Sequence, residues 1–344
     1  MERIAFIYGD IFIYWHSVIL TCGILTAIFL FLAFWLDRGG KLLSGAAAVV
    51  VSFLLSIVLS RFIHWYSMSS TYASFHTAMT DYTTGSFALM GVFIGCILAA
   101  CLLRLFKVHN KLLTMLDSMA LAGACGIAVG RLADLFTNAD LGMEVGFSTG
   151  LPFAYPVVDM LTGETTYRLA TFMIQSMVAG VLFLVLMVAY FRRRQGKCVL
   201  PEGDIALLFI LVYCASQALL DSTRYDSLFF RGNGFVSIVQ VLSTVGVVGS
   251  IVCFSVRMVQ NRGWKYGYLL IWLLIAGSLG GAGYMEYHVQ RHGHQAVFAY
   301  SMMTLCLAAA VLLTLIIHRL SLRNPKFAAY MKFLTTGTAK CCAG

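Results

Sequence analysis

The sequence predicts an all-α polytopic integral membrane protein with about nine transmembrane helices. Three observations support this class: 60% of the 344 residues are hydrophobic, only 11% are charged, and the mean hydropathy is +0.84. Soluble globular domains carry about 25% charged residues, so the chain falls well outside their range. Apolar stretches of about 20 residues, the length that a helix needs to cross a bilayer, recur along the chain.

Nine apolar runs are long enough to span a membrane as helices. They lie at about residues 11–36, 43–63, 86–106, 113–135, 170–191, 204–222, 235–256, 266–284 and 297–317. The first run carries no small-residue cleavage pattern and is longer than the core of a signal peptide, so we expect it to be a retained span.

The basic residues predict the orientation of these spans. If the N-terminus lies outside, 17 of the 24 lysines and arginines fall in inward-facing segments, together with only four of the fifteen acidic residues. This is the positive-inside pattern. We therefore expect an outer N-terminus and a cytoplasmic C-terminus.

The chain divides into a seven-span core, residues 1–262, and a second part, residues 263–344, with two further spans and a basic cytoplasmic tail. The stretch "VRMVQNRGWKYG" marks the boundary. Two outward loops of the core are long, residues 64–85 and 136–169. Because the inward loops are short and basic, the outer side is the expected working side.

Several kinds of partner are not expected. None of the ten cysteines forms a CxxC pair and seven lie within apolar runs, which is typical of small core residues rather than of a metal site. No phosphate-binding loop, dinucleotide fingerprint or metalloprotease helix occurs. The net charge of +9 belongs with topology and anionic lipid, not with nucleic acid. We expect no metal and no soluble cofactor.

Charged residues near the span ends are the first candidates for function, because ionisable groups in a membrane are costly unless paired or hydrated. Arg131 and Asp134 are three residues apart in "GIAVGRLADLF", and Asp221 and Arg224 repeat the spacing in reverse order. Each pair could simply help helices to pack. Two pairs at one depth instead favour a shared polar site, in which an arginine fork would bind the phosphate of a phospholipid head group.

Three further residues lie in the same outer layer. Arg168 and Arg61 could join the head-group cluster or extend to the interface. His16, next to Trp15, could accept a proton or be an interfacial histidine without a chemical role.

Five segments between about residues 8 and 258 stand in the order and spacing of one family. The strongest is "LDSMALAGACGIAVGRLADLFTNADLG", with Gly130, Arg131, Leu132 and Gly142 at motif positions; the others are "IFIYWHSVILTCGI", "SRFIHWY", "TTGSFALMGVFIG" and "YCASQALLDSTR" followed by "GFVSIVQVLS". Together they resemble the bacterial prolipoprotein diacylglyceryl transferases. That family moves diacylglycerol from phosphatidylglycerol to the lipobox cysteine of a prolipoprotein.

The resemblance implies a multi-pass transferase of the bacterial inner membrane, with phosphatidylglycerol and the prolipoprotein signal peptide as substrates. Arg131 would be catalytic, and because the family's motif histidine is absent from this chain, we expect His16 or Asp134 to be the base. The phospholipid head group would lie against Arg131, Arg224, Gly142, Arg168 and Arg61. We also expect a polar cluster of Asp221, Gln217 and Gln240 at the positions of the later motifs, where Gln240 matches the family and Asp221 stands in place of a glutamate.

The chain also departs from the family pattern. Met90 stands where the family has its motif histidine, His16 replaces a tyrosine, Asp134 an asparagine and Gln217 an arginine. Two alternatives to the transferase therefore stay open. One is a lipid-binding or assembly protein with the same fold and no chemistry, and the other is a lipid transporter.

Overall fold

The computed structural model describes residues 4–9, 11–68, 72, 74–80, 87–137, 139–146, 150–158, 163–197, 200–231, 236–292 and 295–322. They divide into two compact units, Met1–Val247 and Val248–Gly344. The predicted domain boundary at residue 262 stays a prediction. The basic tail beyond residue 322 lies outside the described residues.

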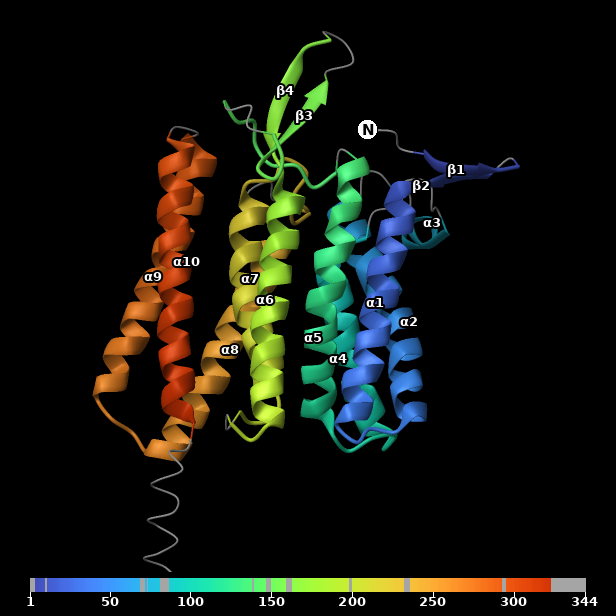
Figure 1. Ribbon diagram of the computed structural model, residues 1–344. Coiled ribbons are helices and arrows are strands. Elements are labelled where there is room, and N and C mark those ends of the chain that lie inside the picture. Colours follow the sequence, from blue (N-terminus) through green and yellow to red (C-terminus); the bar gives the residue numbers. More distant parts are fainter. Residues whose placement is uncertain are drawn as a thin grey trace, which may run out of the picture. The chain divides into compact units, whose positions relative to one another are not determined.

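The described residues are mostly helical, as predicted (Figure 1). The long helices are α1 (Trp15–Asp37), α2 (Leu42–Ser67), α4 (Leu89–Leu105), α5 (Leu112–Gly130), α6 (Thr171–Arg194), α7 (Asp204–Ser222), α8 (Ile238–Arg262), α9 (Gly267–His292) and α10 (Ala296–Ser321). Each coincides with one predicted apolar run. Among the described residues, eight helices are long and apolar enough to cross a membrane, whereas α4 has only 17 residues. The count of nine spans and the orientation of the termini stay predictions.

The prediction of an all-α chain missed two short hairpins. Strands β1 (Ile4–Tyr8) and β2 (Ile11–Tyr14) pair antiparallel directly before α1, and β3 (Ala154–Val158) pairs with β4 (Thr165–Leu169). The first predicted span therefore begins with a strand, because β-branched and aromatic residues in "IFIY" suit a strand as well as an apolar helix. A short helix, α3 (Phe75–Thr80), and a 3-10 helix, η1 (Arg131–Phe136), complete the described elements.

Helices of the first unit approach closely at glycines. α1 packs along α5, where a Cβ on Gly23 would come within 2.9 Å of the Gly126 carbonyl oxygen (Figure 1). α2 packs along α4 in the same way, with Gly95 against the backbone and hydroxyl of Ser56. Small residues are typical of membrane helix interfaces because they let two backbones come together.

A buried carboxylate fixes the start of α7. Asp117 of α5 is 2% exposed and accepts hydrogen bonds from the backbone N–H groups of Gly203 and Ala206, each at 3.0 Å, and from Arg193 Nη1 at 3.1 Å. The first N–H groups of a helix lack intrahelical partners, so this side chain caps α7 from a neighbouring helix. It thereby fixes α7 against α5. The candidate site lies at the other end of these two helices.

The second unit contains α9, α10 and most of α8. α9 and α10 run side by side (Figure 1), and Gly281 of α9 faces Cys306 of α10. Trp272 Nε1 donates to Ser255 Oγ at 3.0 Å, and Asn261 Nδ2 donates to the Ser321 carbonyl oxygen at 2.7 Å. Polar contacts of this kind hold the three helices together in an apolar environment.

Candidate active site

The candidate site lies at the end of the first unit from which the β3–β4 hairpin projects (Figure 1). α5 ends there at Gly130 and continues as η1, which begins with Arg131. In a 3-10 helix the side chains at i and i+3 eclipse, so Arg131 and Asp134 lie on one side of η1. Their closest atoms, Arg131 Nη1 and Asp134 Oδ2, are 3.5 Å apart.

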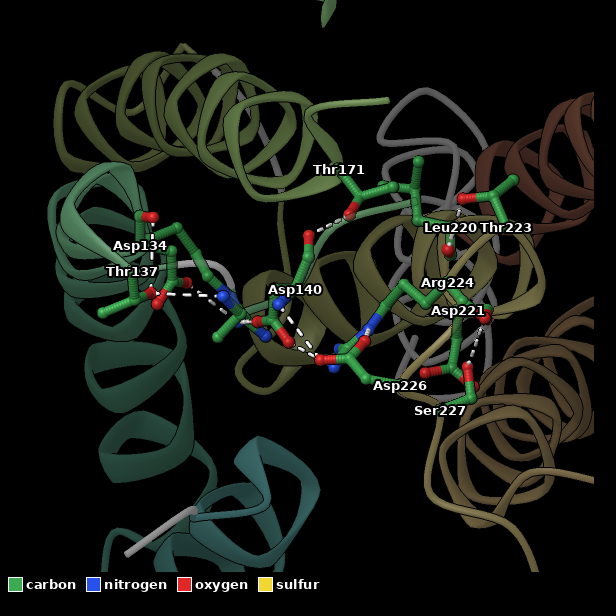
Figure 2. A network of polar contacts seen from close by, with 12 residues as sticks. Asp134, Thr137, Asp140, Thr171, Leu220, Asp221, Thr223, Arg224, Asp226 and Ser227 are labelled. Carbon is green, nitrogen blue, oxygen red and sulfur yellow. Dashed lines mark hydrogen bonds and ion pairs between the residues drawn. The ribbon is translucent and has the colours of Figure 1, made fainter. Parts of the chain in front are cut away.

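Asp140 brings the two predicted arginines together. Its carboxylate pairs through Oδ2 with Arg131 Nη1 and through Oδ1 with Arg224 Nη2. The three side chains are 13–16% exposed. Figure 2 shows Asp140 between the Asp134 side and the Arg224 side of this network. The two arginines, 93 positions apart in the sequence, therefore share one anionic partner.

Asp226 forms the far side of the network. Its Oδ1 accepts from Arg224 Nε at 3.0 Å, and its Oδ2 accepts from the backbone N–H of Asp140 at 3.1 Å (Figure 2). The carbonyl oxygen of Asp140 accepts from the Thr171 hydroxyl at the start of α6. These contacts join the segment after η1 to α6 and to the end of α7.

His16, at the start of α1, lies beside Asp134. Its Nε2 is 3.6 Å from Asp134 Oδ1, and its side chain is 35% exposed while that of Asp134 is 11% exposed. The predicted base candidates thus lie together, and Asp134 also contacts Arg131. A histidine with a carboxylate on one nitrogen has the arrangement of a proton acceptor.

Gly142 contacts the network through its backbone. It forms a bridge with Arg224, and its N–H donates to the Leu169 carbonyl oxygen at 2.8 Å. A Cβ at this position would come within 2.9 Å of Leu169 Cβ and 3.0 Å of Thr171 Cγ2. Only glycine fits this approach without a shift of its neighbours.

Two predicted head-group residues lie in other surroundings. Arg168 of β4 places its guanidinium over the Tyr225 ring, 4.6 Å from the ring centroid, and forms a bridge with Glu144. Arg61 of α2 is 1% exposed and lies over the Phe87 ring at 4.8 Å. The guanidinium groups of both arginines thus lie over aromatic rings, whereas those of Arg131 and Arg224 pair with carboxylates.

The predicted polar cluster is only partly assembled. Asp221 and Gln217 are each 2% exposed and lie four residues apart on one face of α7. Gln217 Nε2 makes no hydrogen bond within the described residues. Gln240, by contrast, accepts from the Ser237 N–H at 3.3 Å and caps the start of α8.

Tyr213 adds a further buried polar group. It is fully buried in α7, one turn before Gln217, and its hydroxyl lies close enough to Arg131 to interact with the guanidinium. Buried polar side-chain atoms are normally hydrogen-bonded. Gln217 Nε2 therefore leaves a buried donor that a bound ligand can use.

Sequence reasoning missed Asp140, Asp226 and Thr171 as members of the network. Asp226 stands two residues after Arg224 and could have been found from that spacing. Asp140 stands nine residues after Arg131, a separation with no fixed geometry outside a helix. Within the part of the chain that the structure describes, no group of three or more metal-ligating side chains occurs.

An apolar pocket of about 340 Å³ opens elsewhere in the first unit. It is lined from α2, α4, the segment before α8 and the beginning of α8, with Phe62, Ile94, Phe230 and Leu242 among its residues. Its lining is entirely apolar. Hydrocarbon is the ligand that such a lining accepts.

Comparison with known proteins identifies the family. The sequence model described as prolipoprotein diacylglyceryl transferase matches residues 3–256. The phosphatidylglycerol–prolipoprotein diacylglyceryl transferase of Clostridioides difficile is 26% identical over 262 residues, which cover 76% of this chain and 98% of that protein. The protein of the same name from Streptococcus equi subsp. equi is 26% identical over 269 residues, covering 77% and 98%. The chain belongs to the prolipoprotein diacylglyceryl transferase family.

Proposed function

We propose that this protein transfers the diacylglyceryl group of phosphatidylglycerol to the lipobox cysteine thiol of prolipoproteins in the bacterial inner membrane. One observation carries the assignment: Arg131 and Arg224 converge on a single carboxylate at the end of a membrane helix bundle. Two guanidinium forks around one anion are suited to a lipid phosphate.

In the proposed reaction the cysteine thiolate attacks the glyceryl carbon that carries the phosphate ester. A carbon–sulfur bond forms, the carbon–oxygen bond breaks, and glycerol phosphate leaves with that oxygen. The phosphate goes from one negative charge to two as the bond breaks. Arg131 and Arg224 then stabilise the transition state more than the bound lipid, which is the condition for catalysis.

The thiol must lose its proton, since only the thiolate is a good nucleophile. His16 is the proposed acceptor, and Asp134, 3.6 Å from His16 Nε2, would orient the ring and stabilise its protonated form. The Asp134 carboxylate also contacts Arg131 at 3.5 Å, so it links the proposed base to the proposed phosphate site.

Two other features support a lipid substrate. The apolar pocket between α2, α4 and α8 has the lining and volume to take part of an acyl chain. Gln217 and Tyr213 offer buried polar groups that could bind the ester or glycerol oxygens. The lipobox would approach from the side of the β3–β4 hairpin, which projects from the end of the unit that carries the network (Figure 1).

Complementation of a strain depleted of its own transferase tests this function. We expect the full chain to restore lipidated lipoproteins, read as a mass increase of the modified peptide. The Arg131→Ala variant should fail and Arg168→Ala should succeed, since Arg168 stacks on Tyr225. Normal membrane insertion without lipidation would contradict the proposed transferase activity and favour a lipid-binding protein with the same fold.

A further inference from the structure

The space between the two arginines is occupied by a side chain of the protein itself. The two carboxylate oxygens of Asp140 divide between Arg131 and Arg224, one oxygen to each guanidinium. Within the described residues, Asp140 alone pairs with both arginines, because Asp134 contacts Arg131 and Asp226 contacts Arg224.

The backbone holds Asp140 in this place. Its φ of +56° lies in the left-handed region, which non-glycine residues seldom adopt. Its N–H donates to Asp226 Oδ2 at 3.1 Å, and its carbonyl oxygen accepts from Thr171. The carboxylate is therefore presented to the arginines by an anchored segment.

The charges of the network do not favour the addition of another anion. Three carboxylates, those of Asp134, Asp140 and Asp226, contact two guanidinium groups, so the formal sum is one negative charge with His16 neutral. These side chains are 11–28% exposed, so solvent screens them only in part. A lipid phosphate must therefore replace a carboxylate.

We propose that Asp140 is an internal stand-in for the phosphate of the lipid, displaced when a phosphodiester binds, and that it sets the affinity and selectivity of the site. This rests on the proposed function, in which both arginines hold the lipid phosphate. A carboxylate carries one negative charge over two oxygens, and a phosphodiester carries one over two non-bridging oxygens. The exchange keeps the charge of the network, with one oxygen for each guanidinium.

The exchange of the Asp140 carboxylate for a lipid phosphate should favour binding of phosphodiesters over that of other phosphates. A phosphomonoester brings a second negative charge next to Asp134 and Asp226, so it should bind more weakly than a phosphodiester. Competition also lowers the apparent affinity for the diester, because only the fraction of protein with Asp140 displaced can bind it. Removing the charge of Asp140 should remove this competition.

The Asp140→Asn variant tests the proposal. Asparagine tolerates a positive φ and keeps the backbone contacts, so the fold should be retained. Binding of dihexanoyl-phosphatidylglycerol, a phosphodiester, and of dihexanoyl-phosphatidic acid, a phosphomonoester, is measured calorimetrically on the full chain in neutral detergent, without acceptor peptide. Asp226→Asn, which removes the negative charge beside Arg224 and keeps an amide oxygen that can accept from the Asp140 N–H, is the matched control.

We expect Asp140→Asn to bind the phosphodiester about tenfold more tightly than the wild type, and Asp226→Asn to gain clearly less. The wild type should bind the phosphodiester more tightly than the phosphomonoester. Unchanged or weaker binding by Asp140→Asn would overturn the proposal, as would equal binding of the two lipids by the wild type.

The same experiment separates this inference from the proposed function. If the lipids bind in the expected pattern but the protein transfers no diacylglyceryl group, the proposed transferase activity is overturned and the stand-in role of Asp140 is supported. Undiminished phosphodiester binding in both Arg131→Ala and Arg224→Ala would overturn the shared phosphate site and the inference together.

Discussion

Replacing Arg224 by glutamine removes one of the two guanidinium groups from the network. Arg224 Nη2 pairs with Asp140, Nε lies 3.0 Å from Asp226 Oδ1, and the side chain is 13% exposed. Glutamine keeps amide donors but has no charge and a shorter reach. The variant therefore loses the charge-assisted bond to the phosphate that we propose for Arg224.

The size of the effect follows from this burial. A hydrogen bond to a charged group contributes about 1.5–3 kcal/mol, and the low exposure of Arg224 keeps solvent from screening it fully. At about 1.4 kcal/mol for each factor of ten, kcat/KM should fall roughly tenfold to 150-fold. Because the charge on phosphate grows as the bond breaks, kcat should carry much of the loss.

The assay uses purified full chain in mixed micelles with phosphatidylglycerol and a lipobox peptide, and mass spectrometry detects the thioether product. Arg168→Gln is the matched control, because Arg168 contacts the Tyr225 ring instead of Asp140. The kcat/KM of Arg224→Lys should lie between those of Arg224→Gln and Arg168→Gln, because lysine keeps the positive charge but lacks the planar fork of donors. Equal losses in Arg224→Gln and Arg168→Gln would refute the reasoning and indicate a diffuse electrostatic effect.

Three further predictions concern stability. Asp117→Ala should lower the free energy of unfolding by about 3–5 kcal/mol, because it leaves Arg193 and two buried N–H groups without their carboxylate. Denaturation in detergent measures this free energy. A loss below about 1 kcal/mol would argue against the role of Asp117 as the cap of α7. Gly95→Ala should lower the free energy of unfolding by about 1–3 kcal/mol in the same assay, because its Cβ would lie 2.7 Å from Ser56 N. Gly123→Ala is the control: a Cβ there has nothing within 4 Å, so the free energy of unfolding should be unchanged or slightly higher. Burial lowers the pKa of His109, in the loop between α4 and α5, below its ordinary 6.5, so the unfolded chain binds this proton more readily and stability falls as pH drops through 6.5. Thermal unfolding at pH 5 and pH 7.5 should show a smaller pH dependence for His109→Leu, and identical profiles would exclude this contribution.

The helices were predictable from the sequence because membrane spans are long, apolar and nearly continuous. Each predicted run from 43–63 to 297–317 coincides with a helix, and the ends differ by up to eight residues. The hairpins were not predictable in this way. Strand β2 continues directly into α1 through "IFIYWHSV", and an apolar run of this kind carries no signal that separates four strand residues from the helix that follows.

The site was predictable only where its geometry is local. The pair Arg131 and Asp134 follows from a spacing of three, and the family resemblance singles out Arg224. Asp140 joins the two arginines through a loop, and its position depends on tertiary contacts to Thr171 and Asp226. No sequence periodicity reports such contacts. The partners of Arg168 and Arg61 were missed for the same reason, since their rings come from other segments.

A double-mutant cycle between Arg131 and Arg224 tests the central claim most directly. The quantity measured is kcat/KM for diacylglyceryl transfer in the wild type, Arg131→Ala, Arg224→Ala and the double variant. If both arginines hold one phosphate, the single losses should not add, and the double variant should lose clearly less activity than their product. Losses that multiply fully would mean that the two arginines act at independent places, and would contradict a shared phosphate site.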